Sequence, residues 1–355
     1  MSPRDDPKVP DQERPLSRRV TLEDVSRAAG ASLATVDRVI NDRPGVKERT
    51  RLRVLQAASR LGYLASLPEA APGTPSGLVF DVVLPDGTNR FILNLAKHLA
   101  ETAAQHPDVE TRLHMIEGFN PGAMAQKLDE LIGKSHGVAV TALDHPRLRE
   151  SIRSLSAAGT PVVTLASDIT QAPRVGYVGT DNRAAGRLAG YLLGRFLNGK
   201  TGKVALFAGS LSYRGHEERE MGFRHILAES YSNLTTVELR EVSDDTSRGY
   251  AEAKLLLSRH PDLAGIYSIG GGVEGIALAL EEAGLGQEVV FIGHELTEET
   301  RRLLVSGTID ALIDQNPRVE AREAIDLLIQ AARGVLHPKS RPIRVHAIFR
   351  ENLPE

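Results

Sequence analysis

A G-x-G-x-x-G motif, formed by Gly270, Gly272 and Gly275, has the most defined possible chemistry in this chain of 355 residues. It follows the β-like run A-G-I-Y-S-I and precedes a helical stretch, and Glu295 lies 25 residues after Gly270. Glycines in such a turn let the backbone approach a pyrophosphate, and a later carboxylate binds the ribose of a dinucleotide. That fingerprint normally sits on the first strand of its domain, whereas here it follows the third predicted strand of a lobe. A dinucleotide-dependent oxidoreductase is therefore the alternative function.

The other patterns of catalytic or metal-binding type are incomplete. The run from His294 to Glu298 lacks the second histidine of H-E-x-x-H, and the run from Gly209 to Tyr213 lacks the second glycine of G-x-S-x-G. Four further histidines show no metal-like spacing: His98, His106, His114 and His136. The chain has no cysteine, which excludes disulfides and thiolate metal sites. We predict no catalytic residue, no metal site and no cofactor.

Polar side chains and one aromatic ring gather where the predicted strands of residues 78–355 end. Ligands of an open α/β sheet bind beyond the carboxyl ends of its strands. Carboxylates, amides and arginines suit a polyhydroxylated ligand, because each hydroxyl both donates and accepts a hydrogen bond. For any one of these residues, a helix cap or an exposed loop position is the alternative role. The candidate ligand-binding residues are Asp86, Asn89, Arg90, Phe91, Asp144, Ser167, Asp168, Glu217, Arg219, Gly271, Glu295 and Gln315.

Residues 21–63 predict a second kind of chemistry, which is contact with DNA. Thr21 caps a first helix, with Asp24 three residues later as in a capping box, and Gly30 ends that helix. Ser32 caps a second helix, and a third helix follows a short polar turn. Two short helices about a glycine turn, braced by a third, form a helix-turn-helix, whose second helix lies in the major groove.

The second of these helices carries the residues that we expect to contact base edges. They lie at its start and on its exposed face: Ser32, Leu33, Ala34, Thr35 and Arg38. Arg38 can bond bidentately to O6 and N7 of guanine, and a phosphate contact is its alternative role. Four further residues are placed to hold phosphates: Thr21, Asn41, Thr50 and Arg51.

Charge separates this head from the rest of the chain. Residues 1–66 contain 13 Lys and Arg and 9 Asp and Glu, a net charge of +4. The whole chain carries −3, so the remaining residues carry −7. A basic head on an acidic body directs a polyanion such as DNA to the head.

The remainder of the chain alternates β-rich runs with amphipathic helical stretches, which indicates parallel α/β sheets. Strands are predicted to start near residues 78, 109, 137 and 161, and again near 202, 235, 264 and 288. The similar spacing of the two series predicts one architecture used twice, as two doubly wound lobes that face a cleft. The fold class is therefore α/β, with an all-α headpiece in front of two parallel-sheet lobes.

Amino-acid composition and proline-rich stretches divide the chain into four parts. Residues 1–19 contain four prolines and mixed charges, which predicts a disordered tail and no signal peptide. The headpiece covers 20–66, a proline-rich linker covers 67–77, and the two-lobed body covers 78–355. No run approaches about 20 apolar residues, so we expect no membrane span and a cytoplasmic protein.

The headpiece resembles that of the LacI/GalR family of bacterial transcription regulators. The family pattern V-T-L-x-D-V-x-x-x-A-G-x-S-x-x-T-V-x-R-V-I-N, followed by V and T-R, is matched nearly letter for letter by Val20 to Arg51. From Leu78 to about Arg350 the chain is similar to the family's periplasmic-binding-protein-like effector domain. That similarity rests on four runs: D-G-T-N-R-F at 86–91, Y-V-G-T-D-N-x-x-A-G-R at 177–187, R-E-M-G-F at 219–223 and D-Q-N-P at 314–317.

The resemblance implies a ligand-responsive repressor that binds operator DNA and works as a homodimer. It also implies that a sugar, polyol or sugar derivative binds in a cleft between two lobes, and that the turn of the G-x-G-x-x-G motif borders this cleft. Lobe 1 is expected at about 78–180 and 316–340, and lobe 2 at about 181–315 and 341–355.

Two positions depart from the family pattern. Relatives fold a hinge helix after the headpiece, whereas Pro68, Pro72 and Pro75 in this linker disfavour a full helix. Sugar-binding relatives place an arginine where this chain has Glu217, so the identity of the ligand cannot be transferred.

Overall fold

The computed structural model of the protein describes residues 21–40, 45–61, 77–335, 338–339, 341 and 343–354. The predicted tail, most of the predicted linker and the candidate phosphate contact Asn41 lie outside the described residues. The chain divides into two compact units, Met1–Pro72 and Gly73–Glu355, and each is described by itself. Within the described residues, no helix has the length and apolar character that crossing a membrane requires.

The first unit contains three helices, α1 (Leu22–Ala29), α2 (Leu33–Ile40) and α3 (Glu48–Arg60). Thr21 forms the predicted capping box with Asp24, which satisfies backbone donors at the start of α1. Gly30 ends α1 in the left-handed conformation, at φ 57°, where glycine has no steric penalty. Local sequence signals therefore set both ends of α1.

A small core of valine and alanine holds the three helices together. Val25 of α1, Val36 and Val39 of α2, and Val54 of α3 are all buried in it. Because these side chains are short, the helix axes can approach closely. One face of α2 packs in this core, which leaves the opposite face available for contact with DNA.

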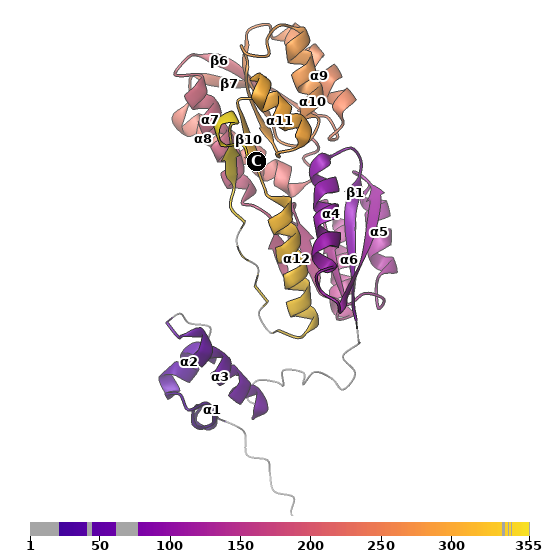
Figure 1. The fold of residues 1–355 in the computed structure, drawn as a ribbon, viewed down its shortest axis with the longest axis vertical. Coiled ribbons are helices and arrows are strands. Elements are labelled where there is room, and N and C mark those ends of the chain that lie inside the picture. The colour runs from indigo at the N-terminus through magenta and orange to yellow at the C-terminus, as the bar shows by residue number, and fades with distance from the viewer. Residues whose placement is uncertain are drawn as a thin grey trace, which may run out of the picture. The chain divides into compact units, whose positions relative to one another are not determined.

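The second unit begins with lobe 1, a five-stranded parallel sheet in the order β2-β1-β3-β4-β5. Figure 1 labels β1 of this sheet and the helices α4, α5, α6 and α12 of the same lobe. Helices α4 and α12 cover one face of the sheet, and α5 and α6 cover the other. The elements are β1 (Leu78–Asp86), α4 (Arg90–Ala103), β2 (Val109–Glu117), α5 (Pro121–Glu130), β3 (Gly137–Val140), α6 (Pro146–Ala157), β4 (Val162–Leu165), β5 (Gly176–Val178) and α12 (Pro317–Ala332).

Lobe 2 repeats this architecture with six strands in the order β11-β10-β9-β8-β6-β7, of which only β11 is antiparallel to its neighbour. Helices α7 and α8 cover one face, and α9 and α10 cover the other. The elements are α7 (Asn182–Phe196), β6 (Gly202–Ala208), α8 (Arg214–Ser230), β7 (Leu234–Glu241), α9 (Thr246–Arg259), β8 (Leu263–Ser268), α10 (Val273–Glu282), β9 (Val290–His294), α11 (Glu298–Ser306), β10 (Ala311–Asp314), β11 (His346–Ile348) and the 3₁₀ turn η1 (Arg350–Asn352).

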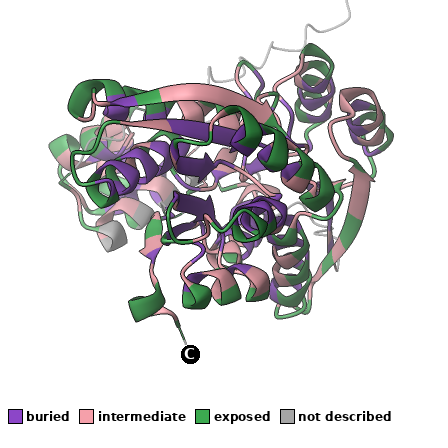
Figure 2. Cartoon of the chain, turned by 90° about the horizontal axis from the view of Figure 1, so that it is seen from above, coloured by how far each residue is buried: buried purple, intermediate pink, exposed green. Residues whose placement is uncertain are grey.

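The strands form the buried centre of each lobe. Figure 2 shows buried strands between helices whose outer faces are exposed. The central strands β3 and β4 are buried at every residue, as expected for parallel strands covered on both faces. Their apolar runs are therefore continuous along the sequence and do not alternate.

The predicted fold class is confirmed, and the eight predicted strand starts lie within two residues of observed ones. Strands β5, β10 and β11 are additional to the two predicted series. The chain passes between the lobes after β5, after β10 and before β11. At these crossovers an isolated parallel bridge joins Thr180 and Ile343.

Glycines let α7 and α8 of lobe 2 pack closely against each other. A Cβ atom added at Gly186 would lie 1.9 Å from the carbonyl oxygen of Arg219, and one at Gly222 would lie 2.1 Å from that of Arg183. Both obstacles are backbone atoms, which cannot rotate away. Close packing of these two helices therefore requires glycine at both positions.

We predict that Gly186→Ala lowers the free energy of unfolding by about 1–3 kcal/mol, because the added methyl group forces α7 away from α8. Urea unfolding followed by circular dichroism measures this change. Gly286→Ala is the matched control, since its nearest neighbour, Cγ of Glu281, lies at 3.5 Å and leaves room for a methyl group. Equal midpoints for the two variants would contradict the packing argument.

Candidate functional site

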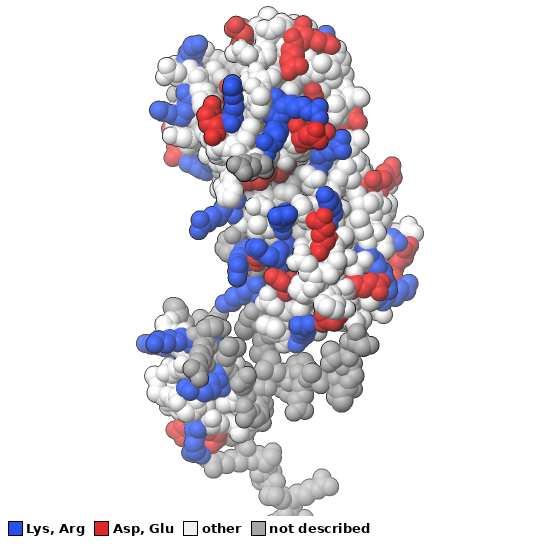
Figure 3. All heavy atoms as spheres, in the orientation of Figure 1, with Lys and Arg blue, Asp and Glu red and all other residues white. Residues whose placement is uncertain are grey.

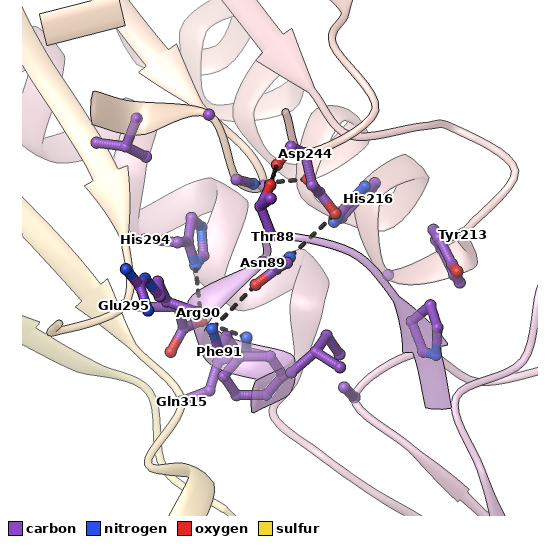
Figure 4. A pocket seen from close by; sticks show the side chains of 18 of the residues that line it. Thr88, Asn89, Arg90, Phe91, Tyr213, His216, Asp244, His294, Glu295 and Gln315 are labelled. Carbon is purple, nitrogen blue, oxygen red and sulfur yellow. Dashed lines mark hydrogen bonds and ion pairs between the residues drawn. The ribbon is translucent and has the colours of Figure 1, made fainter. Parts of the chain in front are cut away.

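A cleft between the two lobes is the main candidate site. It encloses about 820 Å³, including open solvent at its mouth, and loops at the carboxyl ends of strands line it. Eight of the twelve candidate ligand-binding residues line this cleft: Asn89, Arg90, Phe91, Ser167, Arg219, Gly271, Glu295 and Gln315. Figure 4 labels five of them, of which Asn89, Arg90 and Phe91 come from lobe 1, Glu295 from lobe 2 and Gln315 from the crossover after β10.

Glu295 lies at the inner end of the cleft and is 9% exposed. One of its carboxyl oxygens, Oε1, accepts a hydrogen bond from Nε2 of Gln315. The other, Oε2, is buried and has no hydrogen-bond partner among the described residues. Burial, and then the nearby charge of Asp314, raises the pKa of Glu295 to about 8. The cleft thus contains a carboxyl group with one unused acceptor position.

The neighbouring His294 is almost fully buried and also lines the cleft. Its Nε2 is 2.8 Å from the hydroxyl of Tyr267, and burial lowers the pKa of His294 well below its usual value. The imidazole is therefore neutral near pH 7. Its Nδ1 has no hydrogen-bond partner within the described part of the chain, and lies 3.9 Å from Oε1 of Glu295.

Arg219 provides a buried positive charge beside this group. Its Nε donates to Oδ1 of Asn182 at 2.7 Å, and its Nη1 donates to the carbonyl of Ile269 at 2.9 Å. These bonds join α8 to the start of α7 and to the end of β8. Arg219 therefore positions the floor of the cleft as well as lining it.

Asp244 joins the two lobes across the cleft. Its Oδ2 accepts a hydrogen bond from Asn89 at 3.0 Å, and its Oδ1 accepts one from the backbone of Gly271 at 2.6 Å (Figure 4). Its carbonyl oxygen lies 3.3 Å from the hydroxyl of Thr88. Asn89 and Thr88 belong to lobe 1, whereas Asp244 and Gly271 belong to lobe 2. A ligand that enters here therefore meets polar groups of both lobes at once.

An aromatic ring and helix ends complete the lobe 1 side. Asn89 caps α4 by accepting a hydrogen bond from the backbone of Phe91, at 3.0 Å. This cap fixes the start of α4, and the ring of Phe91 is mostly buried where it lines the cleft. An apolar wall opposite polar groups suits the two kinds of surface of a sugar ring.

Four candidate residues do not line this cleft. Asp144 is bonded to Arg149 at 2.7 Å, and Asp168 is bonded to Thr164 at 2.7 Å. Glu217 is exposed in the first turn of α8. Asp86 lines a smaller adjacent pocket of about 290 Å³. These residues were predicted to bind a ligand because they lie near strand ends. In the structure they contact side chains of the same lobe or solvent instead.

Sequence reasoning did not select several residues that line the cleft: Thr88, Thr141, His216, Asp244, Thr246, Glu274, His294 and Thr297. Asp244 carried a usable signal, because the run S-D-D-T at 243–246 lies one residue after the end of β7 and leads into α9. His294 was considered only as part of a metal motif. Groups of three or more metal-ligating side chains are absent from the described residues.

The structure gives a packing reason for the G-x-G-x-x-G motif. A Cβ atom at Gly270 would lie 2.6 Å from Oδ1 of Asp244, and one at Gly275 would lie 1.9 Å from the carbonyl of Thr246. The carboxylate of Asp244 already accepts the backbone N–H of this turn, so it would repel a pyrophosphate there. These glycines serve the contact between this turn and the loop that carries Asp244.

The headpiece presents the predicted base-reading residues on one side of α2. Ser32, Leu33, Ala34 and Arg38 are exposed, with Leu33 at 46%, and Thr35 is partly exposed. Ser32 caps α2 through a hydrogen bond from the backbone of Thr35 at 3.2 Å. Thr21 is exposed, and Thr50 and Arg51 are partly exposed. On the face drawn in Figure 3, Lys and Arg outnumber acidic groups over this unit.

Comparisons with known proteins match both units. The family model for bacterial regulatory proteins, lacI family, matches residues 21–66, and the periplasmic binding protein domain matches residues 80–335. Catabolite control protein A of Priestia megaterium is 27% identical over 222 residues, which are 59% of this chain and 62% of that protein. The ribose operon repressor of Bacillus subtilis is 28% identical over 252 residues, 69% of this chain and 71% of that protein. The solved structure of GanP, a glucose-galactose binding protein from Geobacillus stearothermophilus, has a TM-score of 0.72 at 25% identity, covering 79% of this chain and 100% of that one.

A second buried carboxyl group lies beneath the cleft. Glu320, in the first turn of α12, is fully buried, and neither of its carboxyl oxygens has a hydrogen-bond partner among the described residues. Burial, and then the charge of Glu295, raises the pKa of Glu320 well above its ordinary value. The buried environment of Glu320 therefore favours its protonated form.

We predict that Glu320→Gln stabilises the protein at pH 8 and has little effect at pH 4.5. A raised folded-state pKa means that the unfolded chain releases this proton first, so wild-type stability falls as pH rises above 4.5. The loss is about 1.4 kcal/mol per pH unit until the folded-state pKa is reached. Thermal unfolding at several pH values measures the difference between variant and wild type. A difference between variant and wild type that does not change with pH would contradict the assignment.

Proposed function

Because the chain belongs to the lacI family of bacterial regulatory proteins, we propose that it is a cytoplasmic repressor that binds operator DNA and responds to a small sugar-like effector. The observation that carries the proposal is the presence, in one chain, of a helix-turn-helix with an exposed second helix and a polar cleft between two lobes. The dinucleotide-dependent oxidoreductase has no support among the relatives, which are regulators. We propose no catalytic step.

The exposed face of α2 supports the proposed contact with DNA. A recognition helix reads bases with the residues at its start, and here Ser32, Leu33 and Ala34 occupy that position. Arg38, one turn further along, can bond bidentately to guanine, which is the commonest specific contact in the major groove. Thr21, Thr50 and Arg51 are proposed to hold phosphates, as is Asn41 outside the described residues.

The cleft supports a polyhydroxylated effector. Asn89, Asp244 and Gln315 offer amide and carboxylate groups around it, and Phe91 offers an apolar wall. Hydroxyl groups match such a surface because each can donate to a carboxylate and accept from an amide. The ribose operon repressor and GanP are relatives whose names refer to sugars. A sugar, polyol or sugar derivative is therefore the proposed effector class.

The proposed repressor acts as a homodimer, because one headpiece reads only half of a palindromic site. Lobe 1 offers an apolar surface for this purpose on two neighbouring elements. Leu93 of α4 is 40% exposed and Leu113 of the edge strand β2 is 47% exposed. Burial of such a surface in a dimer removes apolar area from water.

We predict that Arg38→Ala costs about 1–3 kcal/mol of binding free energy on the operator and little on random DNA of equal length. The reason is that a bidentate guanine contact depends on sequence, whereas a phosphate contact does not. Fluorescence anisotropy at one salt concentration measures both affinities. Arg27→Ala is the control, since Arg27 is exposed on α1 outside the recognition helix. Equal losses on both DNAs would make Arg38 a phosphate contact.

A second prediction separates the two units. Gln315→Ala should weaken effector binding about 5- to 150-fold, because removing a buried hydrogen-bond partner costs about 1–3 kcal/mol. The effector is chosen by a thermal-shift screen of sugars and polyols, in which a bound ligand raises the unfolding temperature. Operator affinity without effector should stay within twofold of the wild type, roughly the error of such titrations. Gln287→Ala, which changes a surface amide bonded to Ser306, is the control. Unchanged effector affinity, or loss of operator binding by a folded variant, would contradict the role of Gln315.

A further inference from the structure

We propose that the effector carries a positively charged amino group, which Glu295 binds at the inner end of the cleft. This inference rests on the proposed function, because it concerns the same cleft and narrows the class of ligand. An amino sugar or an amino polyol has the required chemistry: hydroxyl groups for the polar walls and one ammonium for the carboxylate.

The first observation is the unused oxygen of Glu295. The side chain is held in place on one side, where Oε1 accepts a hydrogen bond from Gln315, whose own Oε1 lies 3.4 Å from the hydroxyl of Thr180. The backbone N–H of Glu295 donates to Ile313 at 3.1 Å. A carboxyl group that is fixed so firmly, and whose Oε2 has no partner among the described residues, is positioned for a ligand donor.

The second observation is an excess of acid around this oxygen. Asp314 and Glu320 lie close enough to Glu295 to affect its ionisation or to be affected by it, and Arg219 is the cation that opposes all this charge. The Nε and Nη1 atoms of Arg219 already donate hydrogen bonds to other groups of the protein. Burial raises the pKa of Glu295 and so favours its protonated form, whereas a nearby cation would favour its ionised form.

The third observation is the neutral state of His294. His294 lines the same cleft, its Nδ1 has no hydrogen-bond partner among the described residues, and its buried ring stays uncharged near neutral pH. A neutral imidazole does not repel an ammonium group. Glu295 thus provides a carboxyl acceptor beside a neutral ring, whose Nδ1 lies 3.9 Å from Oε1 of Glu295.

The rest of the cleft disfavours an anionic ligand. Arg90 lies at the mouth, where its Nη2 is 3.3 Å from the carboxylate of Glu299. Asp244 and Glu274 add two more carboxylates to the lobe 2 side. A phosphate or a carboxylate of the ligand that faces Asp244 or Glu274 would be repelled by these carboxylates. An ammonium, in contrast, gains a charge-assisted hydrogen bond, which is about twice as strong as a neutral one.

The test uses four matched pairs that differ by one amino group. They are D-glucosamine with D-glucose, D-galactosamine with D-galactose, D-mannosamine with D-mannose, and glucamine with sorbitol. Calorimetric titration into the full-length protein at pH 7 measures each affinity. In at least one pair the amino member should bind about tenfold tighter or more, which corresponds to about 1.4 kcal/mol. Binding should also release about one proton, measured by repeating the titration in buffers of different ionisation enthalpy.

Glu295→Gln keeps the size and the hydrogen-bonding shape of the side chain but removes its charge. This variant should lose the tenfold preference and the proton release while it still binds the neutral partner. Glu298→Gln is the matched control, because Glu298 is exposed on α11 and pairs with Arg302 outside the cleft. The control should keep both the preference and the proton release.

The inference is overturned if the neutral member binds as tightly as the amino member in every pair, if no amino compound binds, or if Glu295→Gln retains the preference. Binding of neutral sugars that changes operator affinity would then leave the proposed function intact. Failure of the proposed function has a different signature: the protein would bind no operator, or operator binding would ignore every bound sugar.

Discussion

The buried guanidinium of Arg219 is the interaction on which the cleft depends. It is bonded to the side chain of Asn182 and to the backbone of Ile269, and so fixes the start of α7 and the end of β8 relative to α8. The same backbone segment is the reason for Gly186, because the carbonyl of Arg219 occupies the space that a side chain there would need. A buried cation needs hydrogen-bond acceptors, and the side chain of Asn182 and the carbonyl of Ile269 supply two of them.

The hydrogen bonds of Arg219 belong to a larger network that holds the cleft in place, yet some buried polar atoms at the cleft have no hydrogen-bond partner among the described residues. Asn182 is held in turn by the hydroxyl of Tyr177 at 3.0 Å, so a chain of buried polar groups runs from lobe 1 into lobe 2. Most members of that chain are fully bonded. Two buried atoms of residues that line the cleft, Oε2 of Glu295 and Nδ1 of His294, have no hydrogen-bond partner among the described residues. Unsatisfied groups of this kind cost stability, which a bound effector restores.

Much of the fold was predictable, because residues close together in the sequence determine where its helices and strands begin and end. Thr21, Asp24 and Gly30 mark both ends of α1, and apolar runs between glycines mark the central strands. Contacts between distant side chains were not predictable in this way. Asp144 looked like a ligand-binding residue, but Arg149 of the same lobe neutralises it. Asp244 was missed because its role depends on Asn89, which is 155 residues away in the chain.

A repressor that responds to an effector requires coupling between the cleft and the headpiece, and such coupling is thermodynamically reciprocal. If the effector changes operator affinity, the operator must change effector affinity by the same factor. The measurement is a calorimetric titration of the tightest-binding sugar derivative, with and without saturating operator DNA. We predict affinities that differ about 5- to 150-fold, equal to the change in operator affinity caused by that compound. Equal effector affinity in the presence and absence of operator DNA would contradict the account.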